Sequence, residues 1–157
     1  MGSTTPTAQS PSAGDSSLAP LKAQLVGTWR LVSAEDYDED TKQWVPYTFG
    51  NPPSGYFIYD ASGYASVQIM TTPPVELSNP KDGPTPDEAL KIFNGYIAYY
   101  GPWTADGSTL TVVPEGNLNP AQLGTENPQN RPYTLDGDTL TIGSKEAGYI
   151  RTLRRVS

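Results

Sequence analysis

Short runs in which hydrophobic and polar residues alternate, separated by turn residues, make up most of the chain after residue 25. The first run starts at Val26, and an extended strand places its Trp29, Leu31, Ser33 and Glu35 on one face. A tryptophan at the start of such a strand can plug the narrow end of a small barrel. The last run, residues 149–156, would pair with the first in a closed barrel. We therefore expect Arg151 or Arg155 near Trp29, where a guanidinium can stack on the indole.

The runs between these two predict a meander of antiparallel hairpins. Further strands are expected at residues 43–49, 56–59, 64–70, 96–103, 109–113, 131–135 and 138–142. Tight turns at 60–63, 106–107 and 136–137 join neighbouring runs. One helix is predicted to begin after Thr85, which has Pro86 at the first helical position and Glu88 at the third, a capping box. Eight or nine short strands and one helix indicate an all-β, antiparallel up-and-down barrel.

Composition divides the chain into an N-terminal leader and one domain. Residues 1–20 are rich in Ser, Thr, Pro, Ala and Gly and are expected to be a disordered leader, whereas residues 21–157 form one barrel domain. Residues 21–25 are expected to form a helical turn that closes one barrel end. The proline-rich loop at 71–84 is the natural candidate for a cover over an end of the barrel.

Charge and residue usage narrow the function classes. The chain has 10 Lys and Arg against 17 Asp and Glu, a net charge of −7, which argues against nucleic acid. It has neither Cys nor His, so acid–base chemistry must come from Asp, Glu, Tyr, Lys or Arg. No segment has the length and hydropathy of a membrane span or the pattern of a secretion signal, so we expect a cytoplasmic protein, monomeric or homodimeric, without membrane contact.

The acidic segment at 35–40 is interpreted as a solvated loop. Its aspartates have the spacing of the start of a calcium loop, but Thr41 stands where that loop needs Gly, and Tyr47 where it needs Glu. No metal site is therefore expected.

The strand at 64–70 offers two different barrel interiors. One face carries Tyr64, Ser66, Gln68 and Met70, which would make an amphipathic pocket. The other face carries Ala65, Val67 and Ile69, which would make a packed core. The residues alone leave open which face lines the lumen.

Several of these stretches together resemble the lipocalin-like domain family of small fungal and bacterial proteins. They are residues 27–33, 55–69 and 98–101, with Arg131 and the terminal Arg155. The resemblance implies a barrel around a small-molecule cavity, and some proteins of this kind belong to natural-product pathways as cofactor-free cyclases or isomerases. The family often has a His on the strand after Ala-Tyr-x-Gly, where this chain has Thr-Val-Val at 111–113.

The first functional hypothesis is a cofactor-free cyclase or isomerase that holds a small apolar polyketide- or terpenoid-like intermediate in the lumen. Tyr99, Gln68 and Arg131 would polarise a carbonyl, and Glu35 would act as general acid or base if it lay in an apolar lumen. The expected ligand-binding walls are Trp29, Tyr64, Ser66, Met70, Trp103 and Tyr133.

Other interpretations stay open for the same residues. Trp29 and Trp103 also suit a packed core, and Glu35 also suits solvent. Arg131 also suits an ion pair with Glu115, Glu126 or Asp138. The protein would then be a carrier of a small apolar or amphipathic organic ligand, or a packed barrel with an interaction surface.

Overall fold

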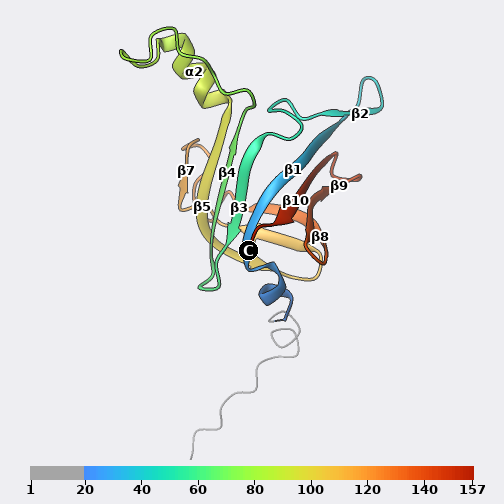
Figure 1. Cartoon of the computed structure of the whole chain (residues 1–157). Coiled ribbons are helices and arrows are strands. Elements are labelled where there is room, and N and C mark those ends of the chain that lie inside the picture. The colour runs from blue at the N-terminus through green and yellow to red at the C-terminus, as the bar shows by residue number, and fades with distance from the viewer. Residues whose placement is uncertain (1–19) are drawn as a thin grey trace, which may run out of the picture.

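Eight antiparallel strands close into a barrel in the computed structural model, which describes residues 20–157 (Figure 1). Around the barrel the order is β1 (Gly27–Asp38), β3 (Ser54–Tyr59), β4 (Tyr64–Met70), β5 (Tyr96–Ala105), β6 (Thr109–Val112), β8 (Gln129–Asp136), β9 (Thr139–Ser144) and β10 (Tyr149–Arg155). β10 pairs with β1 and closes the sheet. Two short strands lie off this path: β2 (Gln43–Pro46) pairs with β1, and β7 (Gly116–Asn117) pairs with β5. The predicted all-β, up-and-down barrel is confirmed, whereas the predicted leader, apart from residue 20, lies outside the described residues.

The predicted hairpins β3–β4, β5–β6 and β8–β9 are all present. In the β5–β6 turn, the Asp106 carboxylate accepts hydrogen bonds from the backbone N–H groups of Ser108, at 2.7 Å, and Thr109, at 2.6 Å. These bonds lower the pKa of Asp106. Short polar side chains at the turns thus set the order of the strands locally.

One barrel end is closed by the helical turn expected before β1. Leu25, the last residue of that turn, is fully buried, and its carbonyl accepts a hydrogen bond from the Trp29 indole N–H at 2.9 Å. Arg155 lies opposite Trp29 in the β1–β10 register, with its guanidinium 4.3 Å from the centre of an indole ring. The predicted plug and the predicted arginine–tryptophan contact are both confirmed.

A β-bulge in β1 changes which residues face the lumen. The register with β10 shifts between Leu31 and Ser33, so the strict alternation that begins at Trp29 is broken there. Ala34 is fully buried, Asp36 lines the lumen, and Glu35 lies on the opposite face. The prediction that Glu35 shares a face with Trp29 is therefore wrong. The expected solvated loop at 35–40 is also corrected, because β1 continues through Asp38.

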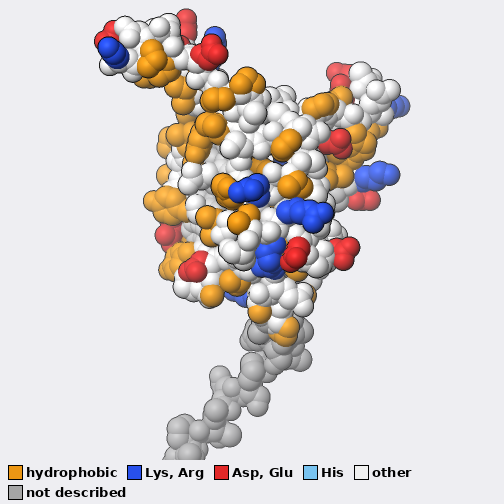
Figure 2. Space-filling model, in the orientation of Figure 1, with side chains coloured by type: hydrophobic (Ala, Val, Ile, Leu, Met, Phe, Trp, Pro, Cys, Tyr) orange, Lys and Arg blue, Asp and Glu red, His pale blue; other side chains and the backbone are white. Residues whose placement is uncertain are grey.

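The face of β4 that lines the lumen is the aliphatic one. Ala65, Val67 and Ile69 are buried, so Tyr64, Ser66, Gln68 and Met70 lie on the outside of the barrel. The Gln68 amide oxygen there accepts a hydrogen bond from the Tyr96 hydroxyl at 2.6 Å. Hydrophobic side chains are scattered over the molecular surface (Figure 2). Tyr56, Ile58 and Tyr64 are among the exposed ones.

Helix α2 (Pro86–Asn94) extends beyond the ends of β4 and β5 (Figure 1). Its predicted capping box is confirmed: the Glu88 N–H donates to the Thr85 hydroxyl at 3.2 Å, and the Thr85 N–H to the Glu88 carboxylate at 3.1 Å. None of its residues is buried. None of the residues 71–84 that lead into it lines the cavity inside the barrel, so this segment does not form the expected cover over that cavity. No helix within residues 20–157 has the length and hydropathy needed to cross a membrane.

Candidate ligand-binding site

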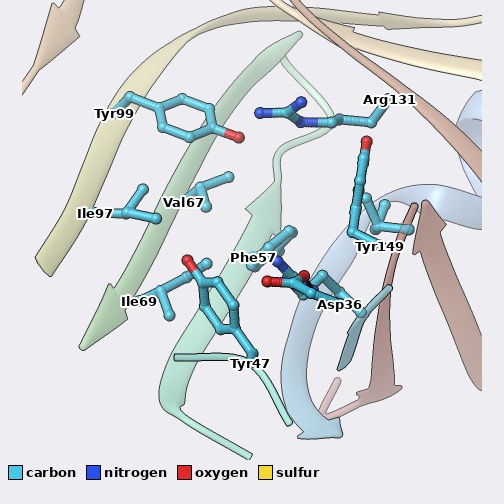
Figure 3. Close-up of a pocket in the computed structure, with 11 residues that line it drawn as sticks. Asp36, Tyr47, Phe57, Val67, Ile69, Ile97, Tyr99, Arg131 and Tyr149 are labelled. Atoms are coloured by element: carbon cyan, nitrogen blue, oxygen red, sulfur yellow. Dashed lines mark ion pairs between the residues drawn. The ribbon is translucent and has the colours of Figure 1, made fainter. Parts of the chain in front are cut away.

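A cavity of about 280 Å³ lies in the barrel lumen (Figure 3). Asp36 and Arg151, which line it, lie at the other end of the β1–β10 pair from Trp29. Its apolar wall is made by Phe57, Val67, Ile69, Ile97 and Ile142. Its polar groups are Asp36, Tyr47, Tyr99, Arg131, Tyr149 and Arg151. Ligand sites commonly combine apolar walls with a few placed polar groups in this way.

Asp36 and Arg151 form an ion pair at the cavity wall. Asp36 Oδ1 lies 2.8 Å from Arg151 Nη1, and the two side chains are 34% and 13% exposed. Arg151 also donates to the Glu35 carbonyl at 2.9 Å, and its guanidinium lies 3.9 Å from the centre of the Tyr47 ring. Several partners therefore hold Arg151 in place, and its charge is compensated.

Burial raises the pKa of Tyr47, and the positive charge of Arg151 opposes that rise. The hydroxyl of Tyr47 is therefore protonated at neutral pH and can act as a hydrogen-bond donor to a ligand.

Arg131, at the start of β8, has a different environment from Arg151. Its guanidinium donates to the Gln129 amide oxygen at 2.9 Å and lies 5.6 Å from the centre of the Tyr149 ring. It forms no ion pair with any residue in 20–157. The alternative in which Arg131 pairs with Glu115, Glu126 or Asp138 is thus wrong, and Asp138 instead lies 3.4 Å from Arg155. The charge of Arg131 is left uncompensated at the lumen.

The Tyr99 hydroxyl points toward the guanidinium of Arg131 (Figure 3). Burial raises the pKa of Tyr99, while the charge of Arg131 acts in the opposite direction. Tyr99 therefore keeps its proton at neutral pH and can donate a hydrogen bond. β5 and β8 bring together these two predicted residues, although neither strand pairs with the other.

Three of the other four predicted aromatic residues, Trp29, Trp103 and Tyr133, are buried but do not line this cavity. Each donates a side-chain hydrogen bond to a main-chain carbonyl: Trp29 to that of Leu25, Trp103 to that of Asp60 at 3.0 Å, and Tyr133 to that of Asp106. These three side chains therefore pack in the core of the barrel and do not form the wall of the cavity.

The remaining predicted residues are not brought to the lumen, since Tyr64, Ser66, Gln68 and Met70 face outward and Glu35 lies on the other face of β1. Sequence reasoning missed Asp36, Tyr47, Tyr149 and Arg151. The expected pairing of the first and last strands was the one signal that could have pointed to Arg151.

Two guanidinium groups and one carboxylate give the cavity wall a positive balance, although the whole chain carries −7. Such a wall attracts an anionic group and can bind it bidentately. Among residues 20–157 no group of three or more acidic, His or Cys side chains is placed to hold a metal ion.

Comparisons with known proteins bear on the fold. A family model described as a lipocalin-like domain matches residues 26–154. No curated protein matches the chain significantly. Among solved structures, an uncharacterized protein from Bacteroides eggerthii DSM 20697 is similar, with 10% sequence identity and a TM-score of 0.45 over 83% of this chain and 98% of that one. No statement about function follows from a likeness at that level.

Proposed function

We propose, from the premise that this chain belongs to the lipocalin-like domain family, that its barrel binds a small amphipathic organic acid in the lumen. A lipocalin-like barrel suggests a small hydrophobic ligand, and the polar groups of this lumen narrow the class. The observation that carries the proposal is Arg131, a guanidinium at an apolar cavity without an acidic partner among the described residues.

The two parts of the ligand would be bound by different forces. Phe57, Ile69 and Ile142 would take its hydrocarbon part, with about 25 cal/mol for each Å² of apolar surface removed from water. Arg131 would bind its carboxylate or enolate through charge-assisted hydrogen bonds, and the Tyr99 hydroxyl would add a donor. The Asp36 carboxylate disfavours a ligand with two negative charges, because it repels the second charge.

The test compares two fluorescent probes that differ in one anionic group. These are 8-anilinonaphthalene-1-sulfonate and the neutral N-phenyl-1-naphthylamine. We expect Arg131→Met to weaken binding of the sulfonate at least about tenfold, the loss of roughly 1.4 kcal/mol, and to leave the neutral probe unchanged.

Arg30→Met is the matched control, because Arg30 also lies at a tyrosine ring but is exposed, with Nη2 at 2.7 Å from the Tyr56 hydroxyl. It should change neither affinity. Equal sulfonate affinities for the wild type and Arg131→Met would rule out the proposal.

A second candidate function is cofactor-free isomerisation or cyclisation of a carbonyl compound in the same lumen. The observation that favours it is Asp36 Oδ1, which is buried and accepts no hydrogen bond from residues 20–157 despite its ion pair with Arg151. This carboxylate lies at the same cavity as Arg131 and Tyr99, which can donate to a carbonyl oxygen.

In that reaction Asp36 would remove a proton from the carbon next to the carbonyl. The C–H electron pair would form the enolate, whose oxygen Arg131 and Tyr99 would stabilise. Return of the proton from Asp36 to another carbon would complete an isomerisation. Attack of the enolate carbon on an electrophilic carbonyl carbon of the same ligand would instead close a ring, with the proton transferred to the new alkoxide.

Deuterium exchange of 2-tetralone in D₂O, followed by NMR, tests the proton-transfer step with a bicyclic ketone. We expect the wild type to exchange the protons beside the carbonyl faster than buffer, and Asp36→Asn to lose about 100-fold or more of that acceleration. Glu35→Gln, one residue away on the other face of β1, should keep it. A wild-type rate equal to buffer would argue against the enzyme and leave the binding function.

A further inference from the structure

A second cavity, of about 300 Å³, lies beside the lumen and is called the vestibule here. Ile97, Tyr99 and Arg131 line both spaces, so the uncompensated guanidinium stands at their junction. Phe93 and Asn94 at the end of α2 form one side of the vestibule. Another side is formed by Asn117 at the end of β7 and by Leu118, Asn119 and Gln122 in the loop that follows.

The vestibule differs from the lumen in the chemistry of its walls. Five carboxamide side chains line it: Asn94, Asn117, Asn119, Gln122 and Gln129. Arg131 is the one charged residue among its lining residues in the described chain, and no carboxylate lines it. A carboxamide offers both donors and an acceptor, so this wall suits neutral groups that also donate and accept hydrogen bonds.

Three of the five carboxamides are already used within the protein. The Asn117 side chain donates to the Gln122 carbonyl at 3.0 Å, and its oxygen accepts from the Asn119 N–H at 2.9 Å. The Asn119 oxygen accepts from the Ala121 N–H at 3.1 Å, and the Gln129 oxygen accepts from Arg131. These bonds shape the loop and orient the guanidinium.

The other two carboxamides keep their hydrogen-bonding capacity. Within residues 20–157 the Asn94 side chain forms no hydrogen bond, and the Gln122 side chain has only a long contact of 3.5 Å to Gln129. They come from different elements, α2 and the loop after β7. The Phe93 ring, 40% exposed, adds an apolar surface beside them.

We propose that the natural ligand is an organic acid with a neutral arm that carries an amide or hydroxyl group, bound in the vestibule by Asn94 and Gln122. The acid group lies at Arg131, the hydrocarbon part fills the lumen, and the arm extends outward past Tyr99. This inference rests on the proposed binding of an organic acid in the lumen.

Two matched fluorescent acids, dansyl-L-glutamine and dansyl-L-norleucine, test the proposal. Both carry a naphthalene ring and a carboxylate, and only the first has an amide in its arm. We expect the wild type to bind the glutamine probe about fivefold more tightly. Asn94→Leu and Gln122→Leu should each remove most of that preference, with no loss of affinity for the norleucine probe.

Gln43→Leu is the matched control, because Gln43 is an exposed β2 residue that lines neither cavity. It should keep the fivefold preference. Asn94 and Gln122 are also exposed, so their variants should keep the wild-type melting temperature.

The two proposals fail in different ways. If both probes bind equally and Arg131→Met weakens both, the lumen site stands and the vestibule inference is overturned. If Arg131→Met weakens neither probe, the acid site itself is refuted, and the vestibule inference falls with it.

Discussion

Each end of the barrel places an arginine against an aromatic ring, but the two ends differ in what else the arginines contact. At the closed end, Arg155 lies over Trp29 and donates to the main-chain carbonyls of Val26, at 2.8 Å, and Gln24. At the open end, Arg151 lies over Tyr47 and pairs with Asp36, while Arg131 donates to the neutral Gln129 amide and has no acidic partner among residues 20–157.

The difference shows how similar contacts can serve stability at one end and binding at the other. Carbonyl oxygens and Asp138 occupy the donors of Arg155, so this guanidinium ties the last strand to the chain before β1. The guanidinium of Arg131 faces a cavity, and no carboxylate of the described residues neutralises it. An arginine with free donors at an apolar space can bind an external anion. The predictions below test this division, from the largest effect to the smallest.

Trp29→Ala should cause the largest loss of stability, because it removes the plug of the closed end. Trp29 is fully buried and donates to the Leu25 carbonyl, so truncation leaves a large cavity and an unsatisfied acceptor. We expect the free energy of unfolding to fall by about 3–5 kcal/mol, measured by urea titration.

Trp44→Ala is the matched control, since Trp44 lies on β2, off the barrel path, in an edge contact with Tyr37. It should cost clearly less. A greater loss for Trp44→Ala would contradict the view that the closed end carries the stability.

Arg155→Met should lower stability, whereas Arg131→Met should lower ligand binding. Arg155→Met removes the cation–π contact with Trp29 and the donor to the Val26 carbonyl, so we expect a stability loss of about 1–3 kcal/mol. Arg131→Met removes a charge without an acidic partner, together with one hydrogen bond to a neutral amide, so stability should change by less than about 1 kcal/mol. Urea titration measures stability, and binding of 8-anilinonaphthalene-1-sulfonate should fall for Arg131→Met alone. Equal effects of both variants on both measurements would remove the distinction between the ends.

Arg151→Met tests the compensated pair at the open end. The change would leave Asp36 as an unpaired carboxylate at the cavity, and we expect a loss of about 1–2 kcal/mol, reduced by the partial exposure of the pair. Asp36→Asn combined with Arg151→Met should cost less than Arg151→Met alone. Additive losses in a double-mutant cycle would show that the pair contributes no coupling.

The smallest effect concerns pH and the α2 cap, which lies outside both barrel ends. Hydrogen bonds from the backbone N–H groups of Ser78 and Thr85 lower the pKa of Glu88 from 4.5 to about 2. Because the folded pKa is below the unfolded one, the stabilisation is present above about pH 4.5 and is lost as the pH falls toward 2.

NMR amide shifts of Ser78 and Thr85 should therefore titrate with a midpoint near pH 2, and Glu88→Gln should abolish that transition. The Trp29 indole N–H resonance is the internal control and should not follow it. A midpoint near 4.5 would show that the cap does not stabilise the carboxylate.

The residues that could be placed from the sequence are those whose contacts are local or follow from barrel closure. The Asp-Gly turns, the capping box at Thr85 and the alternation of β4 each depend on neighbours within a few positions, so the hairpins and α2 were predictable. Pairing of the first strand with the last follows from closure, which made the Arg155–Trp29 contact predictable.

The site depended on two features that local patterns do not contain. Which face of β4 turns inward is decided by packing against the whole barrel. The face that is buried, with Ala65, Val67 and Ile69, has no side-chain polar group that would need a partner, unlike the face with Ser66 and Gln68. The bulge after Leu31 adds one residue to β1. As a result Asp36 lines the lumen, where unbroken alternation from Trp29 would have placed Glu35.

The sequence by itself therefore determined the hairpins, their turns, the capped helix and the closure of the barrel, but neither the extension of β1 to Asp38 nor β7. Each determined feature follows from alternation, turn chemistry or the meeting of first and last strands. Only the tertiary structure decided that Arg131 and Tyr99 share a cavity with Asp36, Tyr47 and Arg151. The physical reason is that a single shift of register reverses which side chains a strand turns inward, and that shift is set by contacts between strands far apart in the chain.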